Sequence, residues 1–466
     1  AIWIGGPAAI FWMWITAIFG MTTKFVEVTL AHKYRTTLSD GSISGGPMYY
    51  IEKSFNMRSA GILFAALMMI CAIGSGNMPQ INNIAGVLDS AFSIPKLATG
   101  LILGIMLWLI ISGGIKRIAK IASRLVPIMA VIYFGGALVV VLENYNNIIP
   151  SFNSIFSQVF SGSAAVGGFL GASFAMSLKL GVARGLYSNE AGQGSSPIAH
   201  ASAKTEHSIE QGMVSILEPF IDTIVVCSVT ALVILSSGAW TQKYENTFER
   251  SSMAIFVGEY NESNINDVEE LGKYILDARK FTENTSAVQN FSGNLNIIDG
   301  ELNLENITIF HNNSIAEDVK FFKQNIPVNG QIEIKNGVIT DNSIQVKGKS
   351  LIHSAELTSK AFGSGLLGVY GEYIVAIGLL LFAFSTAIAW SYYGDRSTAY
   401  IFGETAVPWY RMLYVLCFIA AAIIDTTVIW NIAYVVVALV TIPNLFAMFL
   451  LRKEMREQVT NYIVEK

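Results

Sequence analysis

The chain has 466 residues and a formal net charge of −4 at pH 7; 52% of the residues are apolar and only 14% are charged. Soluble domains carry about 25% charged residues, so the composition excludes an ordinary soluble protein and predicts an all-α polytopic membrane protein. We expect no nucleic-acid partner. We also expect no enzyme, because neither a His-Glu-x-x-His nor a Gly-x-Ser-x-Gly motif occurs, and no phosphate-binding loop is present.

Nine apolar stretches are each close to the length that a hydrocarbon core of about 30 Å requires. Pro79 is expected to kink the second of them. In chain order the predicted spans are Pro7–Ala31, Ala60–Leu88, Leu97–Ile111, Val126–Leu142, Ile155–Leu186, Gly212–Leu235, Leu366–Tyr393, Tyr410–Ile424 and Val428–Leu451.

Lys and Arg cluster in alternate loops, which predicts that those loops lie in the cytoplasm. We therefore predict a multi-pass protein of the cell (inner, cytoplasmic) membrane, with its C-terminus in the cytoplasm. The predicted parts are a first membrane part (residues 1–240), an extracytoplasmic insert (241–360), a second membrane part (361–455) and a cytoplasmic tail (456–466).

The predicted insert differs in composition from the rest of the chain. It holds 17 of the 34 acidic residues, and its apolar residues alternate with polar ones, as in Gln331-Ile332-Glu333-Ile334-Lys335. Asn-Gly and Asp-Gly pairs between such runs are typical of β-turns. We therefore predict a small, mostly β insert with one helix near Ile265 to Lys280.

The fifth span is interrupted by glycines, most densely in Gly167-Gly168-Phe169-Leu170-Gly171-Ala172-Ser173. One interpretation is that the helix unwinds within the bilayer and offers backbone groups to a ligand or ion. The other is close helix packing through small residues. This stretch alone does not choose between them.

Polar side chains inside spans are costly, so they tend to face a cavity. Ser385 and Thr386 in the seventh span could hydrogen-bond the preceding turn. They could instead offer oxygen ligands to Na⁺, together with the carbonyl of Phe382. In the second span four amides fall within Asn77–Asn83, and Gln80 could present both a donor and an acceptor to a small zwitterion.

Two charged residues lie inside the first span. Lys24 and Glu27 are three residues apart and are expected to pair on one helix face. Because they are near the cytoplasmic end of the span, we expect them to reach the membrane interface.

Several motifs of the chain resemble the alanine or glycine:cation symporters, the sodium:alanine symporter family. The similarity covers about residues 1–240 and 361–455. It is carried by Gly5–Gly20, Gly45–Ile51, Gly76-Asn77-Met78 with Gln80, and Ala183–Ser195.

The resemblance implies a leucine-transporter-like fold of two inverted five-helix repeats, with the first core helix absent because this chain opens where that helix has ended. It places a small-molecule substrate near Gln80, Gly168, Phe169, Gly171, Ser173 and Trp390. It places Na⁺, the coupling ion, beside Phe382, Ser385 and Thr386, and it puts Asn189 and Glu190 in a cytoplasmic gate loop.

The function implied is Na⁺-coupled uptake of a small neutral amino acid, alanine or glycine, by alternating access. Trp390 and Phe169 would exclude large side chains. We expect a monomer whose partners are this substrate and membrane lipid. The alternative is a non-transporting ligand sensor, or an inactive truncated remnant, whose outer insert engages a partner.

Overall fold

The structure is a computed structural model that describes the chain except residues 39–40, 279–285, 303–305 and 466, and the side chains of residues 90, 115 and 116. The chain divides into two compact units. The first, the insert unit, comprises Ala1–Trp12, Val139–Gly181 and Ala231–Gly368; the second, the helical unit, comprises Met13–Leu138, Val182–Thr230 and Val369–Lys466.

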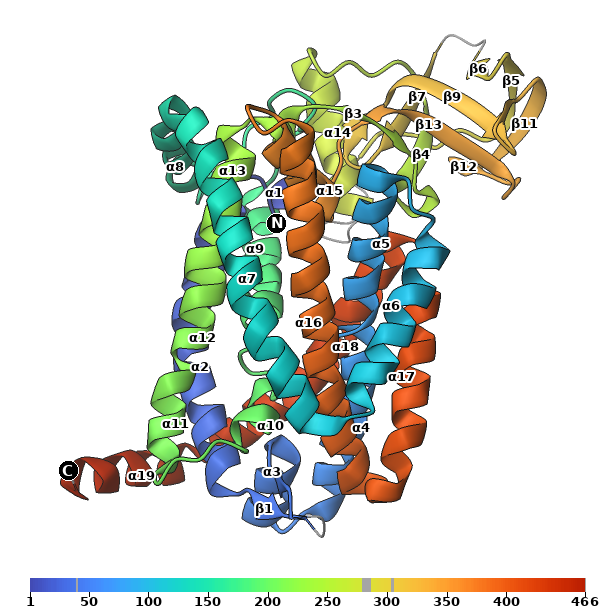
Figure 1. The fold of residues 1–466 in the computed structure, drawn as a ribbon. Coiled ribbons are helices and arrows are strands. Elements are labelled where there is room, and N and C mark those ends of the chain that lie inside the picture. Colours follow the sequence, from blue (N-terminus) through green and yellow to red (C-terminus); the bar gives the residue numbers. More distant parts are fainter. Residues whose placement is uncertain (39–40, 279–285, 303–305, 466) are drawn as a thin grey trace. The chain divides into compact units, whose positions relative to one another are not determined.

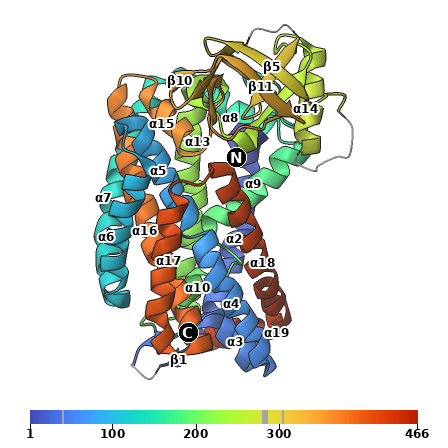
Figure 2. The same cartoon turned by 90° about the vertical axis from the view of Figure 1, so that its right-hand side faces the viewer.

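Long helices dominate the helical unit because its apolar runs satisfy their backbone groups internally, as lipid demands. α16 packs along α4 and α5, and α17 packs along α6 (Figure 1). The view in Figure 2 shows α4 beside α18, which it contacts extensively. The helices that lie wholly or largely in this unit are α2 (Ala8–Lys33), α3 (Pro47–Phe55), α4 (Arg58–Gly74), α5 (Met78–Phe92), α6 (Lys96–Ile111), α7 (Gly114–Glu143), α10 (Ser196–His200), α11 (Ser208–Ser215), α12 (Leu217–Pro219), α16 (Val369–Phe402), α17 (Val407–Ala421), α18 (Thr426–Leu450) and α19 (Arg452–Glu465). The residues of α9 (Phe174–Asn189) and α13 (Cys227–Ser236) are divided between the two units.

Six helices in the described part of the chain are long and apolar enough to cross a membrane, fewer than the nine spans predicted. They are Ala8–Lys33, Arg58–Asp89 (α4 and α5 taken together), Arg117–Glu143, Ser208–Ser236 (α11 to α13 taken together), Val369–Phe402 and Thr426–Leu450. The predicted third, fifth and eighth spans correspond to the shorter helices α6, α9 and α17, of 15 or 16 residues. Large apolar side chains such as Val131, Leu439 and Phe446 are exposed on the long helices, as expected for a lipid-facing surface.

The second span is interrupted where the sequence suggested only a kink. α4 ends at Gly74, and α5 begins at Met78 with Pro79 in its first turn. Proline is tolerated there because the first N–H groups of a helix have no partner within it. The interruption therefore precedes Pro79 and consists of Ser75, Gly76 and Asn77.

The sixth span is continuous but irregular. A π-helical stretch, η2 (Phe220–Val226), separates α12 from α13. Such stretches are frequent at functional sites. Asp222 lies in it and accepts a hydrogen bond from the hydroxyl of Ser188.

Eleven strands lie among the described residues of 241–360 in the insert unit, so a β region is present where the sequence predicted one. An antiparallel sheet has the order β12-β11-β5-β6-β9-β13-β3, with β10 paired to β9; β4, β7 and β8 form a second sheet. Alternation puts Leu295, Ile297, Ile332 and Ile334 in one buried cluster. The strands are β3 (Tyr244–Thr247), β4 (Met253–Val257), β5 (Gly293–Ile298), β6 (Glu301–Leu302), β7 (Ile307–His311), β8 (Ser314–Ile315), β9 (Glu317–Lys323), β10 (Ile326–Pro327), β11 (Gly330–Lys335), β12 (Val338–Ile339) and β13 (Ile344–Ser350).

The insert unit also holds short helices. The predicted helix near Ile265 is α14 (Ile265–Ala278); the end of the predicted range, up to Lys280, lies outside the described residues. The others are α1 (Ile2–Gly5), α8 (Ile148–Ser157) and α15 (Ser354–Gly363). Of the last predicted part of the chain, the tail 456–466, residues 456–465 belong to α19 and residue 466 lies outside the described residues. A two-stranded pair, β1 (Thr36–Thr37) with β2 (Ile43–Ser44), completes the helical unit.

The predicted fifth span is not one continuous helix. α8 ends at Ser157 and α9 begins at Phe174. Between them the backbone folds back on itself through the pairs Ser163↔Ala172 and Val166↔Phe169. The glycine-rich stretch thus interrupts the span, as one of the two interpretations required, but it forms a hairpin-like turn rather than a locally unwound helix.

Candidate functional site

The predicted sodium ligands lie on one turn of the continuous helix α16. The hydroxyl of Ser385 donates to the carbonyl of Phe382 at 2.8 Å, and that of Thr386 donates to the same carbonyl at 3.0 Å. From the sequence, hydrogen bonds of this kind to the preceding turn were the alternative to Na⁺ coordination. Because each hydroxyl uses only its proton in them, its two lone pairs can still accept or coordinate.

The four amides of the second span divide into two kinds. The buried Asn77 and Asn82 donate to carbonyls of α17 and the segment after it (Tyr414, 2.7 Å; Ala421, 3.0 Å; Ile424, 2.7 Å), and Asn83 donates to Pro79 at 2.7 Å. Asn77 and Asn82 therefore join α5 and the residue before it to α17 and the segment after it, whereas Asn83 bonds within α5. Gln80 is half-buried, and its amide makes no hydrogen bond to any residue that the structure describes. Of the four amides, that of Gln80 is therefore the one available to bind a ligand.

The side chain of Trp390 packs against the interruption between α4 and α5. A Cβ added to Gly76 would lie 2.1 Å from Cγ of Trp390, so the indole rests directly on the glycine backbone. Its Nε1 donates to Oε1 of Glu190 at 2.8 Å. The Ser75 carbonyl, freed at the interruption, accepts from the hydroxyl of Tyr187 at 3.0 Å.

The predicted gate residues lie where α9 ends. Asn189 is buried and its Oδ1 accepts from the backbone of Ala191 at 3.0 Å, which forms a local turn. Glu190 has a left-handed backbone (φ 55°) and receives a second bond, from Ser195 Oγ at 2.6 Å. Since Glu190 also holds Trp390, one carboxylate connects the loop 190–196 to α16.

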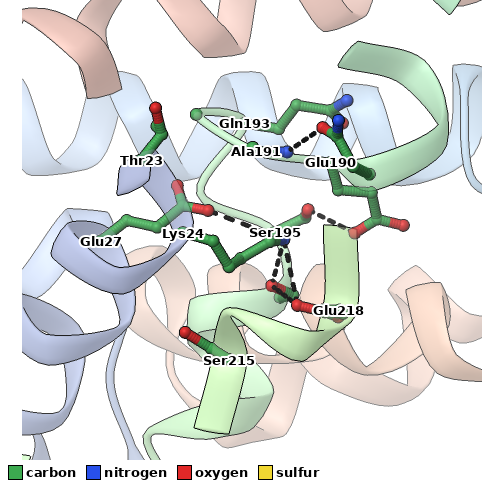
Figure 3. Close-up of polar contacts among 12 residues, drawn as sticks. Thr23, Lys24, Glu27, Glu190, Ala191, Gln193, Ser195, Ser215 and Glu218 are labelled. Atoms are coloured by element: carbon green, nitrogen blue, oxygen red, sulfur yellow. Dashed lines mark hydrogen bonds and ion pairs between the residues drawn. The ribbon is translucent and has the colours of Figure 1, made fainter. Parts of the chain in front are cut away.

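A network of charged and hydroxyl side chains, most of them buried, continues from this loop to α2 (Figure 3). We call it the Lys24 network: Lys24, Glu27, Glu190, Ser195, Ser196 and Glu218. The Lys24 ammonium donates to Ser196 Oγ at 2.7 Å and lies 3.2 Å from Glu218 and 3.7 Å from Glu27. Glu27 in turn accepts from the Gly194 backbone at 3.2 Å.

The expected pairing of Lys24 with Glu27 is confirmed, but their expected place at the interface is wrong. Both side chains are fully buried. The reason is the loop 190–196, together with α12 and Asn444 of α18, which supplies partners that the first span alone could not reveal. Nothing in the local spacing signals that Glu218, nearly two hundred residues away, completes the ammonium's coordination.

The remaining predicted substrate residues belong to the insert unit. Gly168 donates its N–H to the Thr241 carbonyl at 2.8 Å, and Phe169 is buried with its ring 5.2 Å from that of Trp240. Gly171 has φ 90°, a conformation that favours glycine. Ser173 Oγ accepts from the backbone of Met176 at 3.3 Å and so caps α9. Each therefore has a structural role within its own unit.

Metal-binding geometry of the usual kind does not occur in the described part of the chain, where no group of three or more His, Cys, Asp and Glu side chains converges. A cation at Ser385 and Thr386 would thus be held by hydroxyl and carbonyl oxygens. Such neutral oxygens suit a weakly bound alkali ion that must also leave.

Known proteins similar to this chain are transporters. The sodium/alanine symporter AgcS of Methanococcus maripaludis is 33% identical over 452 residues, 96% of this chain and 76% of the relative. An uncharacterized transporter of Haemophilus influenzae is 32% identical over 463 residues, 99% of this chain and 78% of the relative. A probable sodium/glutamine symporter of Bacillus subtilis, GlnT, is 43% identical over 240 residues, 52% of this chain and 49% of the relative.

The family profile described as the sodium:alanine symporter family matches residues 1–266 and 337–466. The unmatched residues all lie in the predicted insert. Because the profile covers most of the chain and AgcS aligns along most of its own length, this chain belongs to the sodium:alanine symporter family.

Proposed function

We propose that the protein takes up a small neutral amino acid, alanine or glycine, together with Na⁺. The observation that carries the proposal, given the family, is the oxygen cluster on α16. There two hydroxyls and the Phe382 carbonyl lie on one helical turn, and the hydroxyl lone pairs remain for an ion. Na⁺ bound there stabilises one conformation of the transporter and so couples the ion gradient to uptake.

The ion site is tested with Ser385→Ala combined with Thr386→Ala. We expect Na⁺ to stimulate labelled-alanine uptake into proteoliposomes much less in this variant. Thr441→Ala is the matched control, because Thr441 on α18 donates to the Val437 carbonyl at 2.7 Å in the same way but lies outside the proposed site. Unchanged Na⁺ dependence in the double variant rejects the assignment.

The substrate residues that we propose in the helical unit are Gln80 and Trp390. The amide of Gln80 has no hydrogen-bond partner among the described residues, which suits the carboxylate or ammonium of an amino acid. The Trp390 indole occupies the space over Gly76 and limits the size of a substrate side chain. Gly168, Phe169, Gly171 and Ser173 remain predictions from the sequence.

Alanine and glycine are preferred to glutamine in this proposal because of Trp390, although GlnT is named a probable glutamine symporter. Competition of unlabelled amino acids against labelled alanine tests the size limit. Glycine, alanine and serine should compete, and glutamine should not. Equal competition by glutamine removes Trp390 as the determinant of size.

We further propose alternating access in a leucine-transporter-like fold with inverted five-helix repeats, in which Asn189 and Glu190 belong to the cytoplasmic gate. The interruptions after α4 and before α9 support discontinuous helices in such a fold. A monomer in the cell membrane, with a cytoplasmic C-terminus and the insert 241–360 outside, completes the proposal. Labelling of single cysteines placed at Asn461 and Asn342 from either side of the membrane tests the orientation.

A further inference from the structure

An apolar hollow of about 470 Å³ lies in the helical unit beside the end of α18. Most of its wall is apolar: Val26 of α2, Leu445, Met448 and Phe449 of α18, and Met455 and Val459 of α19; Thr22, Thr23 and Thr460 also line it. This volume falls in the range of sites that hold small molecules. The apolar lining predicts that hydrocarbon, rather than water, fills it.

Two arginine residues line the same hollow. Arg452 and Arg456 are four residues apart on α19 and both line it. Arg452 donates to the Phe449 carbonyl at 3.0 Å and lies 4.4 Å over the Phe449 ring. Neither guanidinium forms an ion pair with any carboxylate among the described residues, so both can bind an anion.

The acidic side of α19 faces elsewhere. Glu454 pairs with Lys33 of α2 at 2.5 Å and accepts from the Tyr34 hydroxyl at 2.7 Å. The helix thus turns a carboxylate toward the protein and its arginines toward the hollow. This segregation of charge favours an anionic occupant.

The level of the hollow along the membrane normal fits a bound lipid. Its apolar wall is the last turn of a spanning helix, α18, which ends at Leu450, and Arg452 follows two residues later. Charged side chains directly after a span lie at the level of lipid headgroups. A phosphate bound to Arg452 and Arg456 would place an attached acyl chain along Leu445 and Met448.

We propose that this hollow is a binding site for an anionic phospholipid, with one acyl chain in the apolar part and the phosphate on the two arginines. A free phosphate would leave the apolar part unfilled, and a zwitterionic lipid would place its own cation beside the arginines. The site goes beyond the proposed transport function and does not depend on it.

A lipid bound in the hollow should help to hold α19 in place, because few polar contacts join that helix to the rest of the helical unit. Its polar contacts with the rest of the unit are made by Glu454, by Gln458, which accepts from Ser208 at 3.2 Å, and by Tyr462, which donates to Glu210 at 3.4 Å. A lipid between α18 and α19 adds contacts to both helices. We therefore expect bound anionic lipid to raise the thermal stability of the protein.

The test is native mass spectrometry of the full chain in detergent with phosphatidylglycerol or phosphatidylcholine of identical acyl chains. We expect phosphatidylglycerol to be retained more strongly. Arg452→Gln with Arg456→Gln should weaken its binding about 25-fold, about fivefold for each cation near a headgroup. Lys453→Gln is the matched control, because it removes the same charge from the same helix at a residue that does not line the hollow.

A second variant, Val459→Trp, fills the apolar part and leaves the arginines in place. It should reduce phosphatidylglycerol retention while the protein keeps its elution volume and thermal stability without lipid. Equal retention of the two lipids by the unaltered protein overturns the proposal. So does an equal loss in Lys453→Gln and the double variant, or full competition by soluble glycerol phosphate, which would identify a phosphate site without a lipid chain.

Discussion

Replacing Lys24 with methionine removes the ammonium at the centre of the Lys24 network and keeps the length of the side chain. Glu27 then remains fully buried without its ammonium partner, which lies 3.7 Å away in the structure. Breaking a buried ion pair by removing one partner costs about 3–5 kcal/mol. Glu218 adds little to this figure, because its side chain is 42% exposed and water screens it.

The matched control is Lys33→Met in the same helix. Lys33 pairs with Glu454 at 2.5 Å, but its side chain is 39% exposed, so its loss should cost less than about 1 kcal/mol. Lys24→Met combined with Glu27→Gln should recover part of the lost stability, because the isolated buried charge is gone. Chemical denaturation in detergent, followed by tryptophan fluorescence, measures the free energy of unfolding of all four proteins.

The comparison refutes the reasoning if Lys24→Met and Lys33→Met are equally mild, since burial would then contribute nothing. The reasoning is also refuted if the double variant Lys24→Met with Glu27→Gln is much less stable than Lys24→Met alone. In the expected case, Lys24→Met should also slow uptake, because Ser196 and the loop 190–196 lose the bond that holds them to α2.

Three further predictions concern single residues. Burial lowers the pKa of His311 in the insert unit from its usual 6.5 to about 3, so the unfolded chain binds the proton at a higher pH than the folded chain does. The free energy of unfolding should therefore fall by up to about 1.4 kcal/mol per pH unit as the pH drops from 6.5 toward 3. The protease resistance of the insert should fall with it, and should fall less in His311→Gln. Gly76→Ala should displace Trp390, destabilise the protein by about 1–3 kcal/mol and reduce uptake in proteoliposomes. Asp425→Ala should cost about 1 kcal/mol in thermal or chemical unfolding, because Asp425 caps α18 by accepting from Thr427 N at 2.9 Å, whereas Asp425→Asn should cost less.

Local patterns in the sequence predicted what local physics decides. Alternation of Gln331-Ile332-Glu333-Ile334 gave a strand whose isoleucines are buried, since side chains of a strand alternate between faces. The spacing of Lys24 and Glu27 predicted their pairing. The alternative that Ser385 and Thr386 hydrogen-bond the preceding turn is also what the structure shows.

Features that depend on distant contacts could not be predicted in this way. The burial of Lys24 rests on Ser196 and Glu218, which no local rule connects to it. Among the amides, only the structure separates Gln80 from Asn77 and Asn82, because the latter two find carbonyls on and after α17. The hairpin-like turn before α9 likewise depends on pairing across it, so glycine content alone indicated an interruption without its form.

Reversal of the ion gradient tests the central claim most directly. Proteoliposomes containing equal alanine inside and outside are given an inward Na⁺ gradient, and the movement of labelled alanine is followed. If Na⁺ and alanine are coupled, alanine accumulates inside, leaves when the Na⁺ gradient is inverted, and does neither when K⁺ replaces Na⁺. Alanine that only equilibrates, whatever the direction of the Na⁺ gradient, would contradict the account.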